Sequence, residues 1–473
     1  MTDRGAGAEV RLALIGSERA ATIARFSPAE LTARVKAWLA DESDRSLAQR
    51  LAGAAFIIRV ASAVLAYAAQ VLFARWMGSS EFGIYVYVWT WVLLVGSMVD
   101  LGLSSSAQRF IPEYTERRQF AVLRGFLAAS RWLALGVSTA IAVAGALGVL
   151  LLRPWLDQPA IVPLYLACFA LPIYGVMHTQ EGIARSYNWV NLSNLPPFVL
   201  RQVILILLMG AAYFLKFSTS AVTAMICSVL SMWISTVVQF VILSGRLKTK
   251  IKAGPRAFDV RHWFAISIPI FLVEGFYLLL TYADVIVLKQ FSPSRDVAIY
   301  YAASKTLALV AFVYYAVAQT AAHKFTEFHV SGDRERLANF LAHVTRLTFW
   351  PSFGATALVL VFGMPLLWLY GREFVEGYYL MFILAIGLLA RASVGPVERL
   401  LNMLGQQYAC AVVYATAFAI NVGLCVLLIP WLGPAGAAVS TSTALVVESI
   451  LLYVVTKRRL GYYGFVFGRR GRF

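Results

Sequence analysis

The chain has 473 residues, of which 60% are hydrophobic and 14% are charged, and its formal net charge is +17 at pH 7. This composition excludes a water-soluble protein of the same length, which would need far more polar surface. Nucleic acid would also suit the positive charge, but we attribute the excess to cytoplasmic loops and to attraction for anionic membrane lipids, and we expect no nucleic-acid partner.

Residues 1–50 form a polar leader that we expect on the cytoplasmic side. They do not resemble a secretory signal, because the apolar stretch Leu12–Ile15 is short and charges continue after it. Ser27, Pro28 and Glu30 occupy the positions of a helix cap, a first helical residue and a capping-box acid. This pattern predicts a short amphipathic helix in the leader.

Twelve apolar stretches follow between Leu51 and Thr456. Each is about 20 residues long, which is the length that a helix needs to cross the hydrocarbon core of a bilayer. We therefore predict an all-α integral membrane protein with about twelve transmembrane helices. The predicted spans lie near 51–77, 82–108, 126–152, 160–182, 197–215, 219–244, 263–290, 297–323, 344–370, 375–397, 408–430 and 434–456.

Basic residues gather on alternate connections between these spans, which predicts the side of the membrane that each connection faces. Both termini are then cytoplasmic, and the protein is a multi-pass protein of the cell membrane. The cytoplasmic cations are Arg109, Arg117, Arg118, Arg124, Arg246, Lys248, Lys250, Lys252, Arg256, Arg261, Lys324, Arg334, Arg336, Arg346, Lys457, Arg458, Arg459, Arg469, Arg470 and Arg472.

The spans divide into two similar halves. Residues 75–85 align with residues 290–300, and at nearly the same shift Glu181 aligns with Glu398. Each half has an even number of spans, so the two six-helix bundles share one orientation and are related by a pseudo-two-fold axis along the membrane normal. The predicted divisions are a leader (1–50), two bundles (51–244 and 263–456), a basic linker (245–262) and a basic tail (457–473).

Ionisable residues inside the spans are the candidate functional groups, because each is costly in lipid unless it faces water or a partner. A guanidinium can hold a phosphate or diphosphate through two hydrogen bonds. The candidate substrate-binding cations are Arg59, Arg201, Lys305 and Arg391. The alternative is that such cations hold helices together through ion pairs, for example Arg59 with Asp100.

Carboxylates and neutral polar groups lie on the same helix faces as these cations. The carboxylates could balance the cations or bind H⁺ or Na⁺ as a coupling ion, and the sequence leaves both roles open. They are Asp100, Glu181, Glu274, Asp284 and Glu398. The cavity-lining polar residues are Gln70, His178, Tyr277 and Gln319, although His178 also fits a hydrogen-bonded packing role. Glu448 and Arg131 fit packing roles.

Aromatic residues crowd the predicted outer ends of the spans. The aromatic belt at the membrane surface explains most of them, and a platform for stacking sugars is the alternative. They are Trp76, Tyr85, Tyr87, Trp89, Trp91, Tyr300 and Tyr301.

No motif in the sequence indicates catalysis or a cofactor. The chain has no P-loop, no dinucleotide-binding glycine pattern and no metal-binding spacing of His and Cys. We therefore expect no metal site, no cofactor and no ATP-driven transport within this chain. External loops of about 15 residues or fewer also argue against a polysaccharide polymerase or ligase.

Four short motifs resemble Wzx-type oligosaccharide flippases, which translocate O-antigen or exopolysaccharide repeat units and belong to the MATE-like MOP superfamily. The resemblance covers residues 50–460, and it lies in the order and spacing of the motifs. They are residues 78–85 (GSSEFGIY), 283–288 (ADVIVL), 370–374 (YGREF) and 429–438 (IPWLGPAGAA).

The resemblance implies two six-helix lobes that rock between inward-open and outward-open states. It implies a polyprenyl-diphosphate-linked oligosaccharide as cargo, for exopolysaccharide or lipopolysaccharide biosynthesis, and polymerase and export proteins as possible partners. Peptidoglycan-precursor flippases of the same superfamily usually have fourteen spans, and the count of twelve argues against that branch. The alternatives are a cation-coupled multidrug antiporter of the same fold, a membrane polymerase or ligase, and a non-transporting scaffold.

Overall fold

The computed structural model describes residues 44–468, without the side chains of some residues near its start and within 315–330. The leader helix predicted from Ser27, and the tail residues Arg469, Arg470 and Arg472, lie outside the described residues. Contacts group the chain into Met1–Ile57 and Ile58–Phe473, and the architecture below is that of the second unit.

All regular elements of the described residues are helical. The first half contains α3 (Asp44–Gly96), α4 (Leu103–Glu116), α5 (Phe120–Leu151), η1 (Arg153–Trp155), α6 (Gln158–Ser186), α7 (Val190–Asn194), η2 (Leu195–Leu200), α8 (Arg201–Phe214) and α9 (Ala221–Lys250). The second half contains α10 (Val260–Phe291), α11 (Ser294–Leu307), η3 (Ala308–Val310), α12 (Ala311–Val330), α13 (Arg334–Val361), α14 (Gly363–Tyr370), η4 (Arg372–Gly377), α15 (Tyr378–Val394), α16 (Val397–Met403), α17 (Gln407–Leu432) and α18 (Pro434–Leu460).

Eleven helical segments of the described residues are long and apolar enough to cross a membrane. The first, Ile57–Gly96, has 40 residues and is about twice as long as a bilayer requires. Gly78 interrupts it with φ 75° and ψ 167°, a backbone conformation that suits glycine and cannot continue a helix. This segment therefore holds two spans, so that eleven segments correspond to twelve spans, and the predicted all-α membrane fold is confirmed.

Three predicted spans are less regular than their hydrophobic pattern suggested. The span near 82–108 is broken between Gly96, where α3 ends, and Leu103, where α4 begins. The span near 197–215 starts with the π-helical turn η2, whose two prolines cannot donate backbone hydrogen bonds. The span near 297–323 contains the 3₁₀ turn η3 between α11 and α12.

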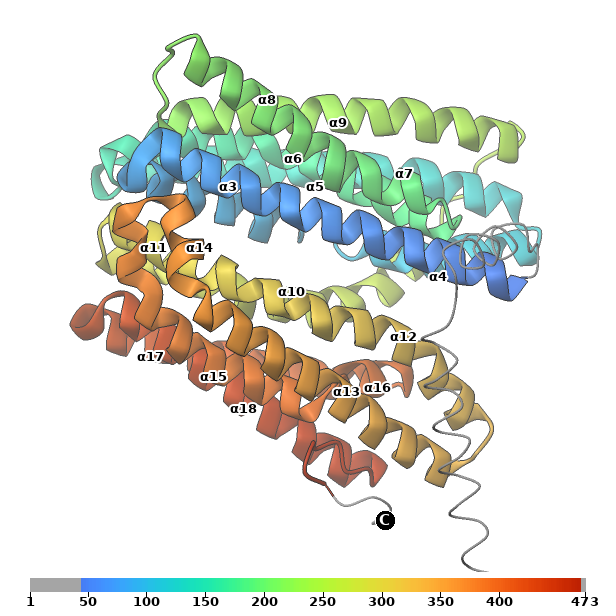
Figure 1. The fold of residues 1–473 in the computed structure, drawn as a ribbon. Coiled ribbons are helices and arrows are strands. Elements are labelled where there is room, and N and C mark those ends of the chain that lie inside the picture. Colours follow the sequence, from blue (N-terminus) through green and yellow to red (C-terminus); the bar gives the residue numbers. More distant parts are fainter. Residues whose placement is uncertain (1–43, 469–473) are drawn as a thin grey trace, which may run out of the picture. The chain divides into compact units, whose positions relative to one another are not determined.

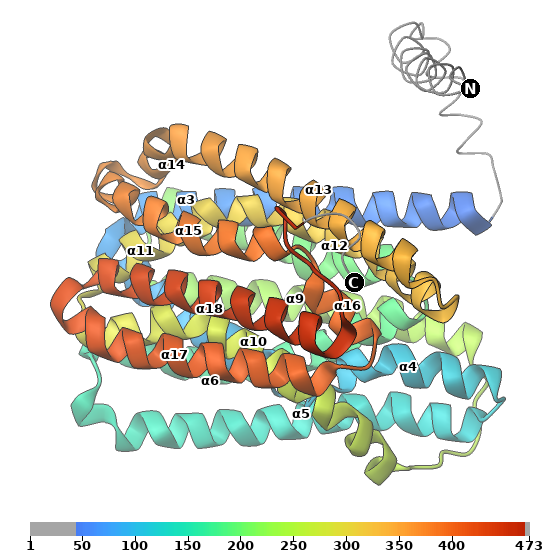
Figure 2. The ribbon, with the colours of Figure 1, turned by 90° about the horizontal axis from the view of Figure 1, so that it is seen from below.

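The helices of residues 58–460 form two bundles (Figure 1), of which the first contains α3 to α9 and the second α10 to α18. In the first bundle α6 packs against α5, α4 and α9, and in the second α17 packs against α10 and α18. Figure 2 shows α15, α18 and α17 side by side on one face of the second bundle. Apolar faces buried between these helices form the cores of both bundles.

The two bundles meet tightly at the sealed end, which we define as residues 75–83, 290–296 and 366–376. The Arg75 guanidinium donates hydrogen bonds to the carbonyl oxygens of Leu369 (2.6 Å) and Trp368 (2.9 Å). A Cβ atom on Gly83 would lie only 1.8 Å from the carbonyl oxygen of Ser294, so only glycine allows the two backbones to approach this closely. The basic residues of the sequence predict that this end faces outward.

Helix α10 joins the bundles at the opposite end. Its Trp263 is 1% exposed, donates a hydrogen bond to the hydroxyl of Tyr114 (3.0 Å) and packs edge-on against Phe126 of the first bundle. The Arg124 side chain donates to the backbone carbonyls of Pro255 and Lys252 in the preceding linker. The start of α10 is thus fixed to the first bundle, whereas its later part packs against α17 of the second.

Candidate functional site

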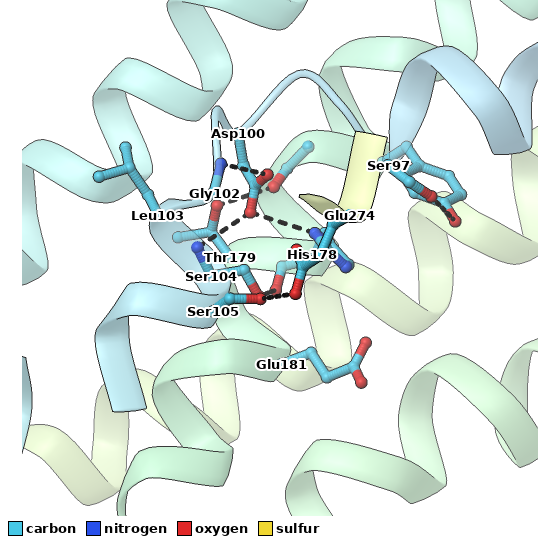
Figure 3. Close-up of polar contacts among 12 residues, drawn as sticks. Ser97, Asp100, Gly102, Leu103, Ser104, Ser105, His178, Thr179, Glu181 and Glu274 are labelled. Carbon is cyan, nitrogen blue, oxygen red and sulfur yellow. Dashed lines mark hydrogen bonds and ion pairs between the residues drawn. The ribbon is translucent and has the colours of Figure 1, made fainter. Parts of the chain in front are cut away.

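The break in the second span positions Asp100 inside the first bundle (Figure 3). Leu101 and Gly102 have φ values of 51° and 78°, and the positive φ of Leu101 is strained for a residue with a branched side chain. The turn lets the Asp100 carboxylate accept hydrogen bonds from the backbone N–H groups of Ser104 (2.9 Å) and Gly102 (3.3 Å). The carboxylate is 2% exposed and lies at the start of α4, where the helix dipole favours negative charge.

His178 of α6 is the ionisable partner of Asp100. Its Nδ1 atom lies 3.1 Å from Asp100 Oδ2, and its carbonyl oxygen accepts a hydrogen bond from the Ser104 hydroxyl (2.9 Å). Helices α4 and α6 approach closely here, since a Cβ atom on Gly182 would lie 2.3 Å from the carbonyl oxygen of Ser104. The alternative pair from the sequence, Arg59 with Asp100, is therefore wrong.

Helix α10 of the second half docks beside this pair. Glu274 accepts a hydrogen bond from the Ser105 hydroxyl (2.8 Å). The hydroxyls of Ser106 and Ser267 lie 2.7 Å apart, and a Cβ atom on Gly102 would lie 2.6 Å from the carbonyl oxygen of Ser267. The broken span thus brings Asp100, His178 and Glu274 from three helices into one polar cluster, which Figure 3 shows.

Arg59 belongs to a second ionic group on the first bundle. Its guanidinium lies 3.8 Å from a carboxylate oxygen of Glu181 and 3.9 Å from the ring centroid of Phe198. Arg185 pairs with the same oxygen of Glu181 from one turn further along α6. Two arginines thus share one buried carboxylate. The Arg59 side chain is 45% exposed, so part of it remains accessible beside the pair.

Arg201 and Lys305 differ from Arg59, because neither forms an ion pair within the part of the chain that the structure describes. Arg201 begins α8, donates a hydrogen bond to the carbonyl oxygen of Pro197 (3.1 Å) and lies 5.4 Å from the ring centroid of Trp89. Lys305 of α11 has its amine 5.0 Å from the ring centroid of Tyr301 and 5.7 Å from that of Tyr282. Both cations are partly buried.

A continuous row of aromatic rings connects these two cations across the bundles, and we call it the aromatic row. From the Arg201 side it runs through Trp89, Tyr85, Phe82 and Tyr301, with successive ring centroids 6.2, 6.4 and 6.2 Å apart. All four side chains are at most 8% exposed. Phe82 and Tyr301 meet across the two bundles. Because the side chains are buried, the interpretation as a lipid-facing aromatic belt is wrong for Tyr85, Trp89 and Tyr301.

Asp284 of α10 lies within electrostatic range of Lys305, but farther away than an ion pair. The carboxylate is 4% exposed and accepts hydrogen bonds from the hydroxyls of Tyr300 and Thr441 and from the backbone N–H of Val285 (2.8 Å). Hydrogen bonds within the second bundle therefore occupy most of the acceptor sites of the Asp284 carboxylate.

Arg391 and Glu398 lie together in the second bundle, where Arg391 also meets a carboxylate that the sequence assigned to packing. The guanidinium lies 3.7 Å from Glu398 and 3.6 Å from Glu448. The sequence analysis does not place Glu448 with these groups. The available signal was an acid inside an apolar span, which is functional by default.

The remaining polar residues of the prediction lie around these groups. Gln70 is 3.5 Å from the hydroxyls of both Tyr301 and Tyr370, next to the sealed end. The ring of Tyr277 lies 5.3 Å from the Arg391 guanidinium carbon. The side chain of Gln319 lies outside the described residues.

The fold encloses ionisable side chains among helices that are long and apolar enough to cross a membrane. No group of three or more metal-binding side chains occurs among the described residues. The family model named "Polysaccharide biosynthesis protein" matches residues 51–323, which is more than half of the 473 residues. The chain belongs to this polysaccharide biosynthesis family.

Solved transporters of the MATE-like fold resemble the chain closely in structure. An inward-facing multidrug resistance MATE transporter of the MOP superfamily has a TM-score of 0.71 at 14% identity, over 86% of this chain and 98% of that chain. An outward-facing MATE transporter has a TM-score of 0.61 at 15% identity, over 86% and 95% of the two chains.

A third match is a MOP superfamily transporter from Pyrococcus furiosus, described by the reverse polarity of its binding pocket. Its TM-score is 0.63 at 15% identity, over 88% of this chain and 96% of that chain. At these identities the three likenesses show the fold alone. No curated protein sequence matches the chain.

Proposed function

We propose that the protein is a flippase that moves a polyprenyl-diphosphate-linked oligosaccharide across the cell membrane by alternating access, for exopolysaccharide or lipopolysaccharide biosynthesis. The family membership supports a role in polysaccharide biosynthesis. The observation that carries the proposal is a pair of cations, Arg201 and Lys305, that form no ion pair with the residues that the structure describes. They come from opposite bundles and lie at the two ends of the aromatic row.

A diphosphate matches these cations chemically. A buried cation without an anion is unfavourable, and a charge-assisted hydrogen bond from an anionic cargo would relieve that cost. The aromatic row between the cations is buried in this state, and its rings would offer flat apolar faces to the sugar next to the diphosphate once the bundles separate. The lipid tail can stay in the bilayer while the headgroup, which cannot cross about 30 Å of hydrocarbon unaided, passes between the bundles.

In this proposal, Arg59 and Arg391 bind the cargo less readily than Arg201 and Lys305 do. Each lies within 4 Å of a carboxylate, so cargo would have to compete with Glu181 for Arg59, and with Glu398 and Glu448 for Arg391. We assign the first contact with the diphosphate to Arg201 and Lys305. We assign a secondary role to Arg59, because its side chain is 45% exposed and that of Arg391 is only 18% exposed. Asp100, Glu274 and Asp284 remain proposed sites for a coupling H⁺ or Na⁺.

The test is complementation of a strain that lacks the gene. Arg201→Ala and Lys305→Ala should each lower polysaccharide export more than tenfold, since each loses a charge-assisted contact of about 1.5–3 kcal/mol. Lipid-linked intermediate should then accumulate facing the cytosol. The matched controls are Arg153→Ala and Lys248→Ala, which remove exposed cations outside the aromatic row. Normal export by both Arg201→Ala and Lys305→Ala would contradict the proposal.

The same experiment addresses the multidrug antiporter. Such a protein would bind organic cations and would need a negatively charged cavity, which the positive charges of Arg201 and Lys305 disfavour. If the alternative holds, both alanine variants should retain or improve the binding of a cationic dye to the purified protein, and surface glycans should not change.

A further inference from the structure

Glu448 is a buried carboxylate without hydrogen bonds. It lies on α18 with an exposed fraction of 0%, and neither of its carboxylate oxygens has a hydrogen-bond partner among the described residues. Its nearest cation is Arg391, whose Nε atom is 3.6 Å from Glu448 Oε1, too far for a hydrogen bond. An ionised carboxylate in this position would be energetically unfavourable. Burial removes its hydration, and no hydrogen bond from the described residues replaces it.

Arg391 cannot neutralise Glu448 alone, because it also faces Glu398. Its Nη2 atom lies 3.7 Å from Glu398 Oε2, and the Arg391 and Glu398 side chains are only 18% and 16% exposed. One guanidinium between two carboxylates leaves an excess charge of −1 if both acids are ionised. Two carboxylates that share a buried site avoid this state by retaining one proton between them.

Among the described residues, no second cation forms an ion pair with Glu398 or Glu448. Facing groups are Tyr277 from α10, Tyr314 from α12, and Cys410 and Tyr414 from α17. Arg399 of α16 lies within electrostatic range of Tyr314, but it forms no ion pair among the residues described. The hydroxyl of Tyr414, which is 1% exposed, has no hydrogen-bond partner among those residues and lies within electrostatic range of both Glu398 and Glu448.

A small cavity adjoins the same guanidinium. It has a volume of about 50 Å³ and is lined by Arg391, Tyr314 and Ser352, together with apolar side chains of α12, α15 and η3. This volume exceeds what one water molecule requires, and the guanidinium and two hydroxyls supply polar partners. The cavity can therefore hold water next to Arg391, the residue that faces both carboxylates.

We propose that Glu398, Arg391 and Glu448 form a proton-binding site in the second bundle, in which the two carboxylates hold one proton between them. Proton binding by these residues does not depend on the nature of the cargo. Only its use in driving the rocking of the bundles rests on the flippase function proposed above. The site also removes Arg391 from the cations that can hold a diphosphate, because its charge is needed by its own neighbours.

Infrared difference spectroscopy of the purified full-length protein in lipid nanodiscs tests the site directly. The wild type should show a carboxylic-acid C=O band that disappears as the pH rises. Glu448→Gln and Glu398→Gln should each lose this band, because the remaining carboxylate then pairs one-to-one with Arg391 and stays ionised. The matched control is Glu376→Gln, which alters an acid that is 61% exposed and paired with Arg295, and which should keep the band.

Two outcomes would overturn the proposal. One is a titrating carboxylic-acid band that persists unchanged in both Glu398→Gln and Glu448→Gln. The other is a wild-type spectrum that responds to Na⁺ and not to pH. Use of the proton is measured separately, as the pH dependence of transport, which should flatten in Glu448→Gln. If the protein does not transport the cargo, the infrared evidence for proton binding is unaffected. If the carboxylates do not bind a proton, the evidence for transport of the cargo is unaffected.

Discussion

Asp100 combines two roles that a single substitution can separate. Its carboxylate pairs with His178, and it also accepts hydrogen bonds from two backbone N–H groups at the start of α4. The backbone contacts keep the broken span in a strained turn, in which Leu101 has a φ of 51°. The contact with His178 and the hydrogen bonds of the turn are therefore separate contributions from one side chain.

Asp100→Asn and Asp100→Ala should consequently have different effects on stability. Asparagine keeps an oxygen that can accept from the backbone, whereas alanine leaves buried N–H groups without a partner, at a cost of about 1–3 kcal/mol. Thermal unfolding of the purified protein in detergent should show a clearly lower midpoint for Asp100→Ala than for Asp100→Asn. Equal midpoints would mean that the hydrogen bonds to Gly102 and Ser104 contribute nothing measurable.

The sequence identified most of the buried ionic residues but not their partners. An acid or base inside an apolar stretch is visible in the sequence, and this rule found Arg201, Lys305 and Asp284. The partner of a side chain depends on which helices pack together and on how they are rotated. The sequence offers Arg59 as a partner of Asp100, yet the turn after Gly96 places Asp100 beside His178 of α6.

At the scale of elements, the hydrophobic pattern predicted the spans well and their interruptions poorly. A stretch of about 20 apolar residues is a sufficient signal for a span, because bilayer thickness sets the length. A break inside such a stretch changes the average hydrophobicity little, so the turn at 97–102 was missed. The available local signal was Asp100 followed by Gly102, since aspartate and glycine favour turns.

Gly83 is the position at which the sealed end depends most on the absence of a side chain. Gly83→Ala places a Cβ atom against the backbone of Ser294, and overpacking of this kind costs about 1–3 kcal/mol. The substitution should push the two bundles apart at the sealed end. In a Ser79→Cys background, where residue 79 is buried, a membrane-impermeant thiol reagent should react about fivefold faster or more.

Gly136→Ala is the matched control for this prediction. Gly136 is also helical, but a Cβ atom there would meet nothing within 4 Å. Alanine at residue 136 should therefore leave the labelling of the cysteine introduced by Ser79→Cys unchanged. The same labelling rate in Gly83→Ala and in its parent would show that the contact between Gly83 and Ser294 does not hold the sealed end closed.

At the scale of the whole molecule, the orientation in the membrane decides which side the sealed end faces. The basic residues predict both termini in the cytoplasm and the sealed end outside. The division into a leader, two bundles, a linker and a tail is likewise a prediction. Its outer boundaries depend on residues 1–43 and 469–473, which lie beyond the described part of the chain.

Labelling of intact cells tests this orientation. Ser80→Cys and Lys250→Cys, both at exposed positions, should react from opposite sides of the membrane. An impermeant reagent should label the Ser80→Cys variant in intact cells, and the Lys250→Cys variant only after the membrane is permeabilised. The natural cysteines contribute little background, because Cys227, Cys410 and Cys425 are buried and Cys168 is partly buried. Labelling of both variants from the same side would overturn the predicted topology.

The most direct test of the account is translocation by the purified protein in liposomes that contain a polyprenyl-diphosphate-linked oligosaccharide. Exposure of the sugar to an enzyme added outside measures the movement of cargo between leaflets. We expect the wild type to accelerate this movement strongly, and the double variant Arg201→Ala, Lys305→Ala to fall to the rate of protein-free liposomes. A wild type that moves no cargo, or a double variant that moves it as fast as the wild type, would contradict the account.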